Sequence, residues 1–430
     1  MSDIVISKND EVNIIVRPND SGITMELSEF FTFYVPGYKF VPSYRNKMWD
    51  GKIRLFDTRN YTLPSGLLYH VEQFAESRGY VISNTIQETR DDEDLPSVPL
   101  SAGGKEIALR DYQEEAIHHA LKYKKSLLLS PTGSGKSLMI YMILRWYIET
   151  SNKNALIVVP TTSLVEQMWK DFADYASNDD SFDPNDVHRI YAGKEKESFR
   201  QRVVITTWQS VFKMPRNWFE DYEMVVGDEA HLFKAKSLTT IMGHLRNAWL
   251  RIGTTGTLDG TKVHKLVLEG AFGPTYNVTS TKKLIESNTL SDLNIDVLAL
   301  TYSDQEKKAF GKKTYQEEIS YITQHEKRNN FIRNLALAQE GNTLVLFNLV
   351  EGHGKPLYNL IKEQANPNRK VFFVSGEVGA IDREQIRELV EKEKDAIIVA
   401  SLGTFSTGIN IKNLHNMVFA APTKSQVRVL

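Results

Sequence analysis

The sequence has no cysteine among its 430 residues, which excludes disulfide bonds and thiolate metal sites and suits a reducing cytoplasm. It also has no excess of basic charge, since 52 Lys and Arg face 54 Asp and Glu. Any surface for a polyanion must therefore be local. No apolar run reaches the roughly 20 residues that span a bilayer, and the N-terminus MSDIVISKND lacks the basic and apolar regions of a secretory signal. These absences predict a soluble cytoplasmic protein without a membrane partner.

An acidic, proline-bearing segment divides the chain. Residues 88–104 read ETRDDEDLPSVPLSAGG, and they offer little apolar material for packing. We therefore predict an N-terminal accessory domain of α+β type over residues 1–87 and a linker over 88–104. The remainder is longer than one hydrophobic core usually fills, so two further lobes are expected.

Short apolar runs alternate with amphipathic helical stretches after this linker, which is typical of a parallel sheet covered by helices on both faces. The first set comprises SLLLS (126–130), ALIVVP (155–160), VVITT (203–207), MVVGDE (224–229) and RIGTT (251–255). The second set comprises IDVLALTY (295–302), NTLVLFNL (342–349), KVFFVSG (370–376), AIIVAS (396–401) and NMVFAA (416–421). We expect an α/β fold with one lobe over residues 105–282 and a similar lobe over 283–430.

The segment SPTGSGKS, residues 130–137, follows a predicted strand and precedes a helical run. Glycines at this place let backbone N–H groups and a helix N-terminus cradle phosphate oxygens. Lys136 would reach the β- and γ-phosphates, and the Ser137 hydroxyl would ligate Mg²⁺. The general pattern has glycine where this chain has Ser130. A glycine-rich turn with an exposed lysine is the simpler alternative, but the register of strand, lysine, hydroxyl and helix favours a site for ATP and Mg²⁺. The residues assigned to it are Thr132, Gly133, Ser134, Gly135, Lys136 and Ser137.

The tetrapeptide DEAH, residues 228–231, ends the predicted strand MVVG. Open α/β sheets bind ligands at the carboxyl ends of their strands. Asp228 would hold Mg²⁺ through water, and Glu229 would orient and deprotonate the attacking water. Lys136, Asp228 and Glu229 are therefore the predicted catalytic residues, although DEAH alone could be a solvated strand end.

Together these motifs resemble those of superfamily-two helicases, which are built on two RecA-like lobes. LRDYQEEAI before the phosphate loop resembles the segment whose glutamine reads adenine, here Gln113. VVPTTSLVEQ resembles the motif that touches the nucleic-acid backbone, and TTGTL resembles the motif that links ATP to nucleic acid. SLGTFSTGIN resembles a second-lobe motif that meets both ligands. The resemblance implies nucleic-acid contacts at Pro160, Thr161, Thr162 and Thr404, coupling by His231, Thr255 and Thr257, and nucleotide contacts at Gly408 and Asn410.

A narrower resemblance is to the phage UvsW helicases. It is carried by YRNKMWDGKIRLFD (44–57), KTYQEEISYIT with HEKRN, FNLVEGHGKPLYNLI and GTFSTGINIKNLHN. This family resemblance implies an enzyme of DNA recombination and repair that regresses forks, migrates Holliday junctions and unwinds R-loops. Branched DNA and RNA–DNA hybrids are the partners it implies, and the oligomeric state is left open.

Basic and aromatic residues concentrate between Lys39 and Tyr61 of the N-terminal domain. Basic side chains can neutralise phosphates and aromatic rings can stack on bases. The alternative is that the aromatic residues form a small core whose charged face is solvated, and the two interpretations are compatible. We predict DNA contacts at Lys52 and Arg54.

The last superfamily motif, Q-x-x-G-R-x-x-R, is not found before the sequence stops at KSQVRVL. Arg428 lies near its expected place without the Gly-Arg context, so the second lobe is predicted to be incomplete and its arginine finger unassigned. Three alternatives follow: a duplex-translocating restriction-enzyme subunit, a non-hydrolysing DNA-binding module, and a small-molecule kinase. The kinase would explain neither DEAH nor the second-lobe segments.

Overall fold

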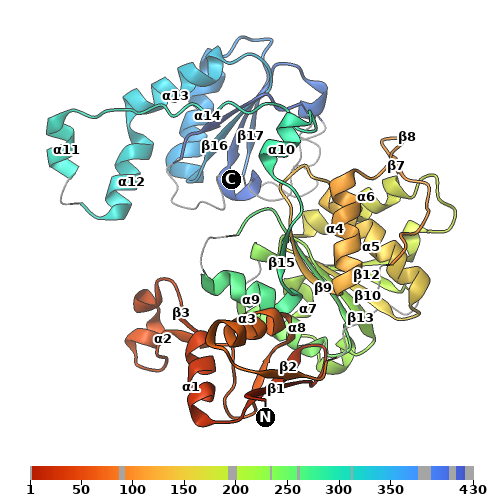
Figure 1. The fold of residues 1–430 in the computed structure, drawn as a ribbon. Coiled ribbons are helices and arrows are strands. Elements are labelled where there is room, and N and C mark those ends of the chain that lie inside the picture. The colour runs from red at the N-terminus through yellow and green to blue at the C-terminus, as the bar shows by residue number, and fades with distance from the viewer. Residues whose placement is uncertain are drawn as a thin grey trace. The chain divides into compact units, whose positions relative to one another are not determined.

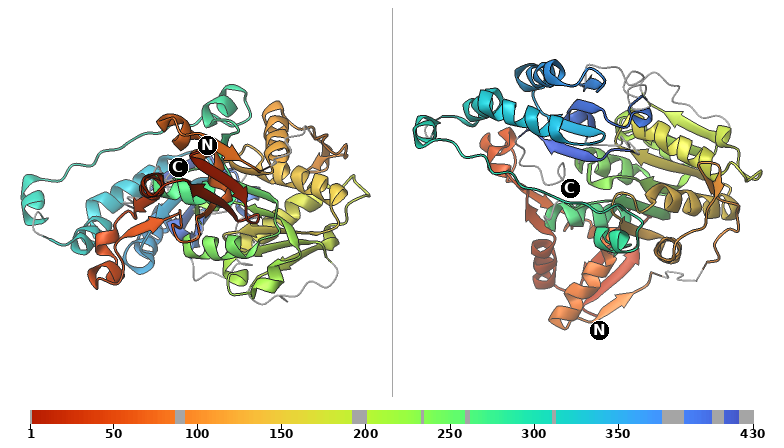
Figure 2. Two further views of the ribbon diagram at one scale, coloured as in Figure 1. Left: turned by 60° about the horizontal axis from the view of Figure 1, so that its bottom comes forward. Right: turned by 90° about the horizontal axis from the view of Figure 1, so that it is seen from above.

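The computed structural model describes residues 2–86, 93–191, 201–232, 235–258, 262–310, 313–375, 389–405 and 413–421. The chain forms two compact units, residues 1–292 and 293–430 (Figure 1 and Figure 2). In the part of the chain described, no helix is both long enough and apolar enough to cross a membrane.

A four-stranded sheet with two helices forms the N-terminal part of the first unit. Its strand order is β5-β2-β1-β6, in which β1 is antiparallel to β2 and parallel to β6. Burial alternates along β1, where Ile4 and Ile6 are buried and Val5 is exposed, as one covered sheet face requires. The elements are β1 (Ile4–Lys8), β2 (Asn13–Pro18), α1 (Ser21–Phe30), β5 (Thr62–Pro64), η2 (Ser65–Leu67), α3 (Leu68–Arg78) and β6 (Ile82–Asn84). This is the predicted α+β architecture.

A small protrusion interrupts this domain between α1 and β5. It consists of β3 (Thr32–Tyr34), η1 (Tyr38–Phe40), α2 (Pro42–Arg45) and β4 (Lys52–Arg54). Strands β3 and β4 pair antiparallel and form a two-stranded sheet of their own.

A seven-stranded parallel sheet forms the first lobe, in the order β11-β12-β10-β13-β14-β9-β15. One hydrophobic cluster joins helices α4, α5 and α6 to one face, and a second joins α7, α8 and α9 to the other. The strands are β9 (Lys125–Leu129), β10 (Asn154–Val159), β11 (Val187–Ile190), β12 (Val203–Thr207), β13 (Tyr222–Gly227), β14 (Leu250–Thr255) and β15 (Thr275–Asn277). The helices are α4 (Asp111–Tyr123), α5 (Lys136–Thr150), α6 (Thr162–Tyr175), α7 (Trp208–Val211), α8 (Ala235–His244), α9 (Lys262–Phe272) and α10 (Thr281–Glu286), with 3₁₀ turns η3 (Pro184–Asp186), η4 (Arg216–Phe219) and η5 (Ala230–Leu232).

The five strands predicted for this lobe are present, with ends that differ by no more than two residues. The edge strands β11 and β15 were not predicted. Their sequences, VHRI and TYN, are short and carry polar residues, so they lack the continuous apolar run of a central parallel strand.

The second half of the predicted linker packs against the first lobe. Leu100 is buried in the cluster of α4, α5 and α6, and Leu95 and Val98 lie against it. A hairpin of β7 (Ser101–Ala102) and β8 (Lys105–Glu106) follows, and the Ser101 hydroxyl donates to the carbonyl of Asp174 at 2.5 Å. The expectation that this segment has too little apolar material to pack was therefore wrong, because three spaced apolar side chains suffice when a core lies beside them.

The N-terminal domain rests on helix α9 of the first lobe. His70 on α3 lies 2.8 Å from the Glu269 carboxylate, and Leu266 belongs to the N-terminal hydrophobic cluster. A side chain on Gly66 would meet the backbone of this helix, so glycine permits the close approach.

The second unit contains a four-stranded parallel sheet in the order β17-β18-β16-β19. Its strands are β16 (Thr343–Phe347), β17 (Val371–Val374), β18 (Ile397–Ser401) and β19 (Asn416–Phe419). Its helices are α11 (Asp304–Phe310), α12 (Tyr315–Gln324), α13 (Glu326–Ala338), the π-helix η6 (Val350–Gly354), α14 (Lys355–Gln364) and α16 (Leu402–Phe405).

Residues 295–302, IDVLALTY, were predicted as a buried strand, and this was wrong. The segment has no strand conformation, and Val297 is 88% exposed. Its apolar residues have no sheet partner in the described part of the chain, so their strand propensity is not realised.

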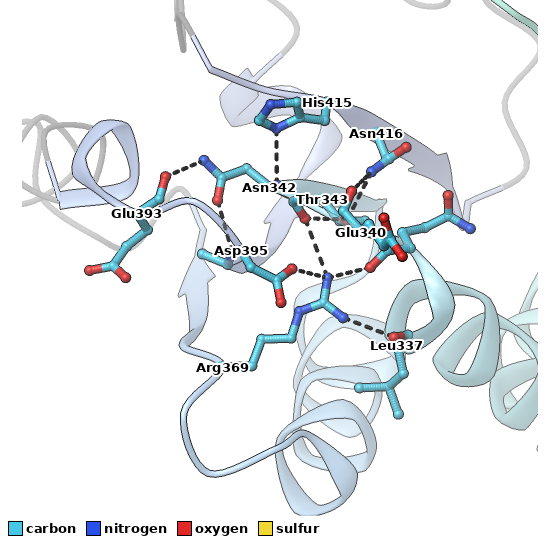
Figure 3. A network of polar contacts seen from close by, with 12 residues as sticks. Leu337, Glu340, Asn342, Thr343, Arg369, Glu393, Asp395, His415 and Asn416 are labelled. Carbon is cyan, nitrogen blue, oxygen red and sulfur yellow. Dashed lines mark hydrogen bonds and ion pairs between the residues drawn. The ribbon is translucent and has the colours of Figure 1, made fainter.

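Polar side chains brace the amino ends of these strands (Figure 3). Arg369 donates to the carbonyls of Leu337, Gln339 and Gly341 and pairs with Asp395 at 2.8 Å. The Asn342 side chain donates to three carbonyls and accepts from the amide of Ala396. This network therefore connects the amino ends of the strands, opposite to their carboxyl ends.

Candidate active site

Four predicted motifs follow the carboxyl ends of four adjacent strands, β10-β13-β14-β9. The phosphate loop follows β9, DEAH follows β13, TTGT ends β14, and Pro160 follows β10. Because these strands are parallel, their carboxyl ends share one edge of the sheet, where open α/β sheets bind their ligands. The topology thus gathers motifs that span residues 130–257 of the sequence.

The phosphate loop turns through glycines with positive φ, +80° at Gly133 and +83° at Gly135. Ser130, which stands where the general pattern has glycine, is fully buried, and its hydroxyl lies 2.6 Å from that of Ser134. Ser134 Oγ also donates to the carbonyl of Pro131 at 2.7 Å. The buried Ser130 hydroxyl therefore holds the phosphate loop through its hydrogen bond with Ser134.

Gln113 holds the phosphate loop in place. Its Nε2 donates to the carbonyl of Ser134 at 2.8 Å, and its Oε1 accepts from the amide of Arg110 at 3.0 Å. A Cβ on Gly135 would lie 2.3 Å from this amide nitrogen, so the close contact requires glycine. The structure thus places Gln113 beside the phosphate loop, and its contact with adenine remains a prediction.

Lys136 and Glu229 are in contact at the carboxyl ends of the central strands. Lys136 Nζ lies 3.3 Å from Glu229 Oε1 and 3.3 Å from the carbonyl oxygen of Ser130. Asp228 is buried, and its Oδ1 accepts from Thr254 Oγ1 at 2.6 Å and from the amide of Glu229 at 2.9 Å. Burial raises the pKa of Asp228, and the neighbouring Glu229 carboxylate raises it further. A cation at this place would therefore be stabilised by two carboxylates.

His231 connects DEAH to the TTGT segment. Its Nδ1 lies 2.7 Å from Thr255 Oγ1 and 3.3 Å from Glu229 Oε2. Thr255 Oγ1 donates to the carbonyl of Thr257 at 2.8 Å. The three predicted coupling residues are thus in one chain of contacts that ends on Glu229.

Helix α6 contributes two side chains that the sequence did not reveal. The Tyr175 hydroxyl lies 2.9 Å from Ser137 Oγ, and Asp171 lies one helical turn before it. Burial raises the pKa of the Asp171 carboxyl, whereas hydrogen bonds from Gln167 and Ser137 act in the opposite direction. The only signal in the sequence was a polar pair spaced by four residues next to the apolar face of α6.

The donor set fits Mg²⁺. The Ser137 hydroxyl and the Asp228 carboxylate are hard oxygen ligands, which Mg²⁺ prefers. Mg²⁺ usually keeps several waters and is held by one or two protein oxygen ligands together with substrate phosphates.

The predicted nucleic-acid contacts of the first lobe lie at the start of α6. Thr161 Oγ1 caps the helix by accepting from the amide of Leu164 at 3.3 Å, and the carbonyl of Pro160 accepts from Gln209. Thr162 is the first helical residue. In the second unit Thr404 belongs to α16, and its side chain, like Gly408, Asn410 and Arg428, lies outside the described residues.

The two basic residues predicted for the N-terminal domain lie on β4 of the protrusion. Lys52 Nζ lies 4.9 Å from the centroid of the Tyr34 ring, and Arg54 forms an ion pair with Asp50. Tyr34 stacks on Tyr38 at a centroid distance of 4.7 Å, and Tyr44 packs edge-on against Tyr38. The tyrosines therefore pack against one another, and the Lys52 ammonium lies over the exposed ring of Tyr34.

Comparisons with known proteins agree with this architecture. Residues 3–85 match the family model of the UvsW DNA helicase N-terminal domain, and residues 106–260 match that of the type III restriction enzyme res subunit. The ATP-dependent DNA helicase UvsW of Enterobacteria phage T4 is 38% identical over 419 residues, which are 94% of this chain and 82% of that relative. The DNA 3'-5' translocase XPB2 of Sulfurisphaera tokodaii is 25% identical over 277 residues, which are 64% of this chain and 54% of that relative.

A solved structure points to the same family of proteins. The crystal structure of T4 UvsW covers 99% of this chain and 86% of its own, with 34% sequence identity and a TM-score of 0.59. Since the identity extends over nearly the whole chain, including the N-terminal domain, the chain belongs to the UvsW family of ATP-dependent DNA helicases.

Proposed function

We propose that this chain binds ATP with Mg²⁺ at the carboxyl edge of the first lobe and uses hydrolysis to remodel branched DNA, including forks, Holliday junctions and R-loops. The observation that carries the ATP site is the meeting of Lys136 with Glu229 at 3.3 Å, beside Ser137 and Asp228. A phosphate-binding lysine and a water-activating carboxylate must both come within reach of the same γ-phosphate, and this contact shows that the two side chains share one site. The host-cell cytoplasm is the proposed compartment, which suits a chain without cysteine.

Each side chain has a role that follows from its position. Ser137 and Asp228 would hold Mg²⁺, which neutralises charge on the β- and γ-phosphates when it is bound. Lys136 would exchange its contact with Glu229 for phosphate oxygens. That exchange frees the Glu229 carboxylate to orient and deprotonate water. Without nucleotide, Glu229 is therefore paired with Lys136, and a bound phosphate would replace Glu229 as the partner of Lys136.

The contacts of His231 provide a route from hydrolysis to DNA. Loss of the γ-phosphate would let Lys136 return to Glu229, which His231 contacts. His231 in turn contacts Thr255 at the end of β14. We infer that these contacts from Glu229 through His231 to Thr255 transmit the state of the nucleotide to the carboxyl ends of the strands, where Pro160, Thr161 and Thr162 lie.

The protrusion of the N-terminal domain is the proposed second DNA surface. The side chains of Phe40 and Met48 are 76% and 75% exposed there, and Lys52 lies over Tyr34. Basic groups suit phosphates and an exposed ring suits unpaired bases at a branch. Lys52→Glu should weaken binding of a forked DNA at low salt, whereas Lys153→Glu on the first lobe should leave it unchanged. Equal affinities of both variants and the wild type would refute this surface.

A second candidate function is translocation on duplex DNA without strand separation. The match of residues 106–260 to a restriction-enzyme subunit favours it. Strand displacement on short forked substrates separates the two functions, since a duplex translocase would hydrolyse ATP without releasing a strand.

The main test is ATP hydrolysis with and without branched DNA, measured beside Lys136→Ala. We expect DNA to stimulate turnover and the lysine change to lower it by about 100-fold or more. Structure-specific DNA binding with no turnover above that of the variant would instead favour a non-hydrolysing DNA-binding module.

A further inference from the structure

Helix α6 contacts the phosphate-loop serine through side chains that belong to none of the sequence motifs. Tyr175 Oη lies 2.9 Å from Ser137 Oγ, and the Tyr175 ring packs against Tyr141 of α5 with centroids 5.7 Å apart. Asp171 precedes Tyr175 by one turn, so both lie on the same side of the helix. Gln167 Nε2 donates to Asp171 Oδ1 at 2.7 Å and fixes that carboxylate.

The apolar side of α6 keeps these groups in place. Val165, Met168 and Phe172 are buried in the core cluster shared by α4, α5 and the sheet. A helix held in this way cannot turn Tyr175 away from Ser137 without breaking that packing. The contact is therefore a fixed feature of the first lobe.

A hydroxyl that binds a metal does so through an oxygen lone pair, so its proton must point to an acceptor on the other side. The Tyr175 oxygen can accept that proton. If Tyr175 instead donates to Ser137, the Asp171 carboxylate is the acceptor. Either arrangement leaves a Ser137 lone pair for the cation. Such outer partners orient metal ligands, and their loss typically weakens metal binding by 10- to 100-fold.

We propose that Asp171 and Tyr175 are positioning residues that orient the Ser137 hydroxyl for Mg²⁺ and thereby set the Mg²⁺ affinity of the nucleotide complex. The proposal rests on the proposed ATP–Mg²⁺ site. It adds two residues of α6 to that site.

The test is a Mg²⁺ titration of nucleotide binding by the full chain, with a fluorescent N-methylanthraniloyl-ADP as the probe. We expect Tyr175→Phe and Asp171→Asn each to raise the Mg²⁺ concentration for half-maximal binding by about 10-fold. Binding of the probe in EDTA should stay within about twofold of the wild type, because Ser137 contacts the metal and Lys136 the phosphates. If Asp171 and Tyr175 had only a structural role, the substitutions would weaken probe binding in EDTA as well as in the presence of Mg²⁺.

Two variants serve as matched controls. Tyr147→Phe removes a buried tyrosine hydroxyl of the same lobe, which donates to the carbonyl of Asn154 at 3.2 Å. Glu166→Gln removes a carboxylate from the same helix, where it pairs with Arg189 at 2.7 Å. Both should titrate like the wild type.

Ser137→Ala separates the two levels of the proposal. If it leaves the Mg²⁺ dependence unchanged, the metal site itself is wrong. If Ser137→Ala weakens Mg²⁺ binding but both α6 variants match the controls, only the positioning role is overturned. Circular dichroism verifies folding, and Asp171→Asn decides the question if Tyr175→Phe fails to fold.

Discussion

Replacing Gly66 by alanine should separate the N-terminal domain from the first lobe. Gly66 is buried in η2, where an added Cβ would lie 2.0 Å from the carbonyl oxygen of Glu269. The next contacts would be 2.8 Å to the amide nitrogen of Gly273 and 3.0 Å to the carbonyl oxygen of Gly270. All three atoms belong to backbone, so no side chain can rotate to make room. The domain must move away from α9.

The size of the effect follows from this geometry. Added atoms in a packed interface typically cost about 1–3 kcal/mol, and movement away from α9 also stretches the 2.8 Å contact between His70 and Glu269. We expect a loss of about 2 kcal/mol, which corresponds to roughly a thirtyfold increase in the detached population.

Hydrogen exchange of the amides in α3 and α9 measures that population, and urea unfolding measures the stability of the unit. Gly243→Ala is the control, because a Cβ at that helical position would meet nothing within 4 Å. It should stabilise by about 0.5–1 kcal/mol. If Gly66→Ala leaves both exchange and the unfolding midpoint at wild-type values, the packing described for this interface is incorrect.

Three further results are expected. Burial lowers the pKa of His353 to about 4, whereas the pKa of histidine in an unfolded chain is about 6.5. Because the unfolded state takes up the proton first as the pH falls, the free energy of unfolding of the second unit should decrease by about 2 kcal/mol between pH 7 and pH 5. Urea titrations should show this decrease in the wild type and not in His353→Gln. Asp179→Asn removes the buried carboxylate that pairs with the Arg145 guanidinium and leaves it the exposed Glu149 carboxylate at 3.6 Å; it should destabilise the first unit by about 3 kcal/mol in the same assay, so an unchanged midpoint would contradict the pairing with Asp179. Thr255→Ala removes the contact with His231 and should lower strand displacement per ATP hydrolysed while nucleotide affinity stays constant; equal coupling in wild type and variant would exclude the route through Thr255.

The central strands could be predicted from the sequence because both of their faces are buried. VVITT became β12 with the predicted ends, since a continuous apolar run is required where helices cover both faces. The same criterion failed at the edges. It missed VHRI and TYN, and it assigned a strand to residues 295–302, because strand pairing depends on neighbours that a local pattern does not contain.

The site shows the same division. The motifs specified Lys136, Ser137, Asp228 and Glu229 as residue types, and parallel strand order brings their segments to one edge. The contact of Tyr175 with Ser137 could not be predicted, because it depends on how α6 crosses α5 and not on a spacing in the sequence. Likewise, the fixed position of Gln113 on the loop carbonyl of Ser134 becomes visible only when both segments are folded.

If the two proposed sites are correct, helix α6 connects the binding of DNA to the binding of Mg²⁺. Its 14 residues extend for about 20 Å from the predicted DNA contact at Thr162 to Tyr175 beside the proposed Mg²⁺ ligand. A shift that DNA imposes on the first turn therefore also acts on the last. By thermodynamic linkage, the factor by which DNA changes the affinity for the Mg²⁺–nucleotide complex must equal the factor by which that complex changes the affinity for DNA. The effect of DNA on nucleotide affinity and the effect of nucleotide on DNA affinity are then two measurements of one coupling free energy.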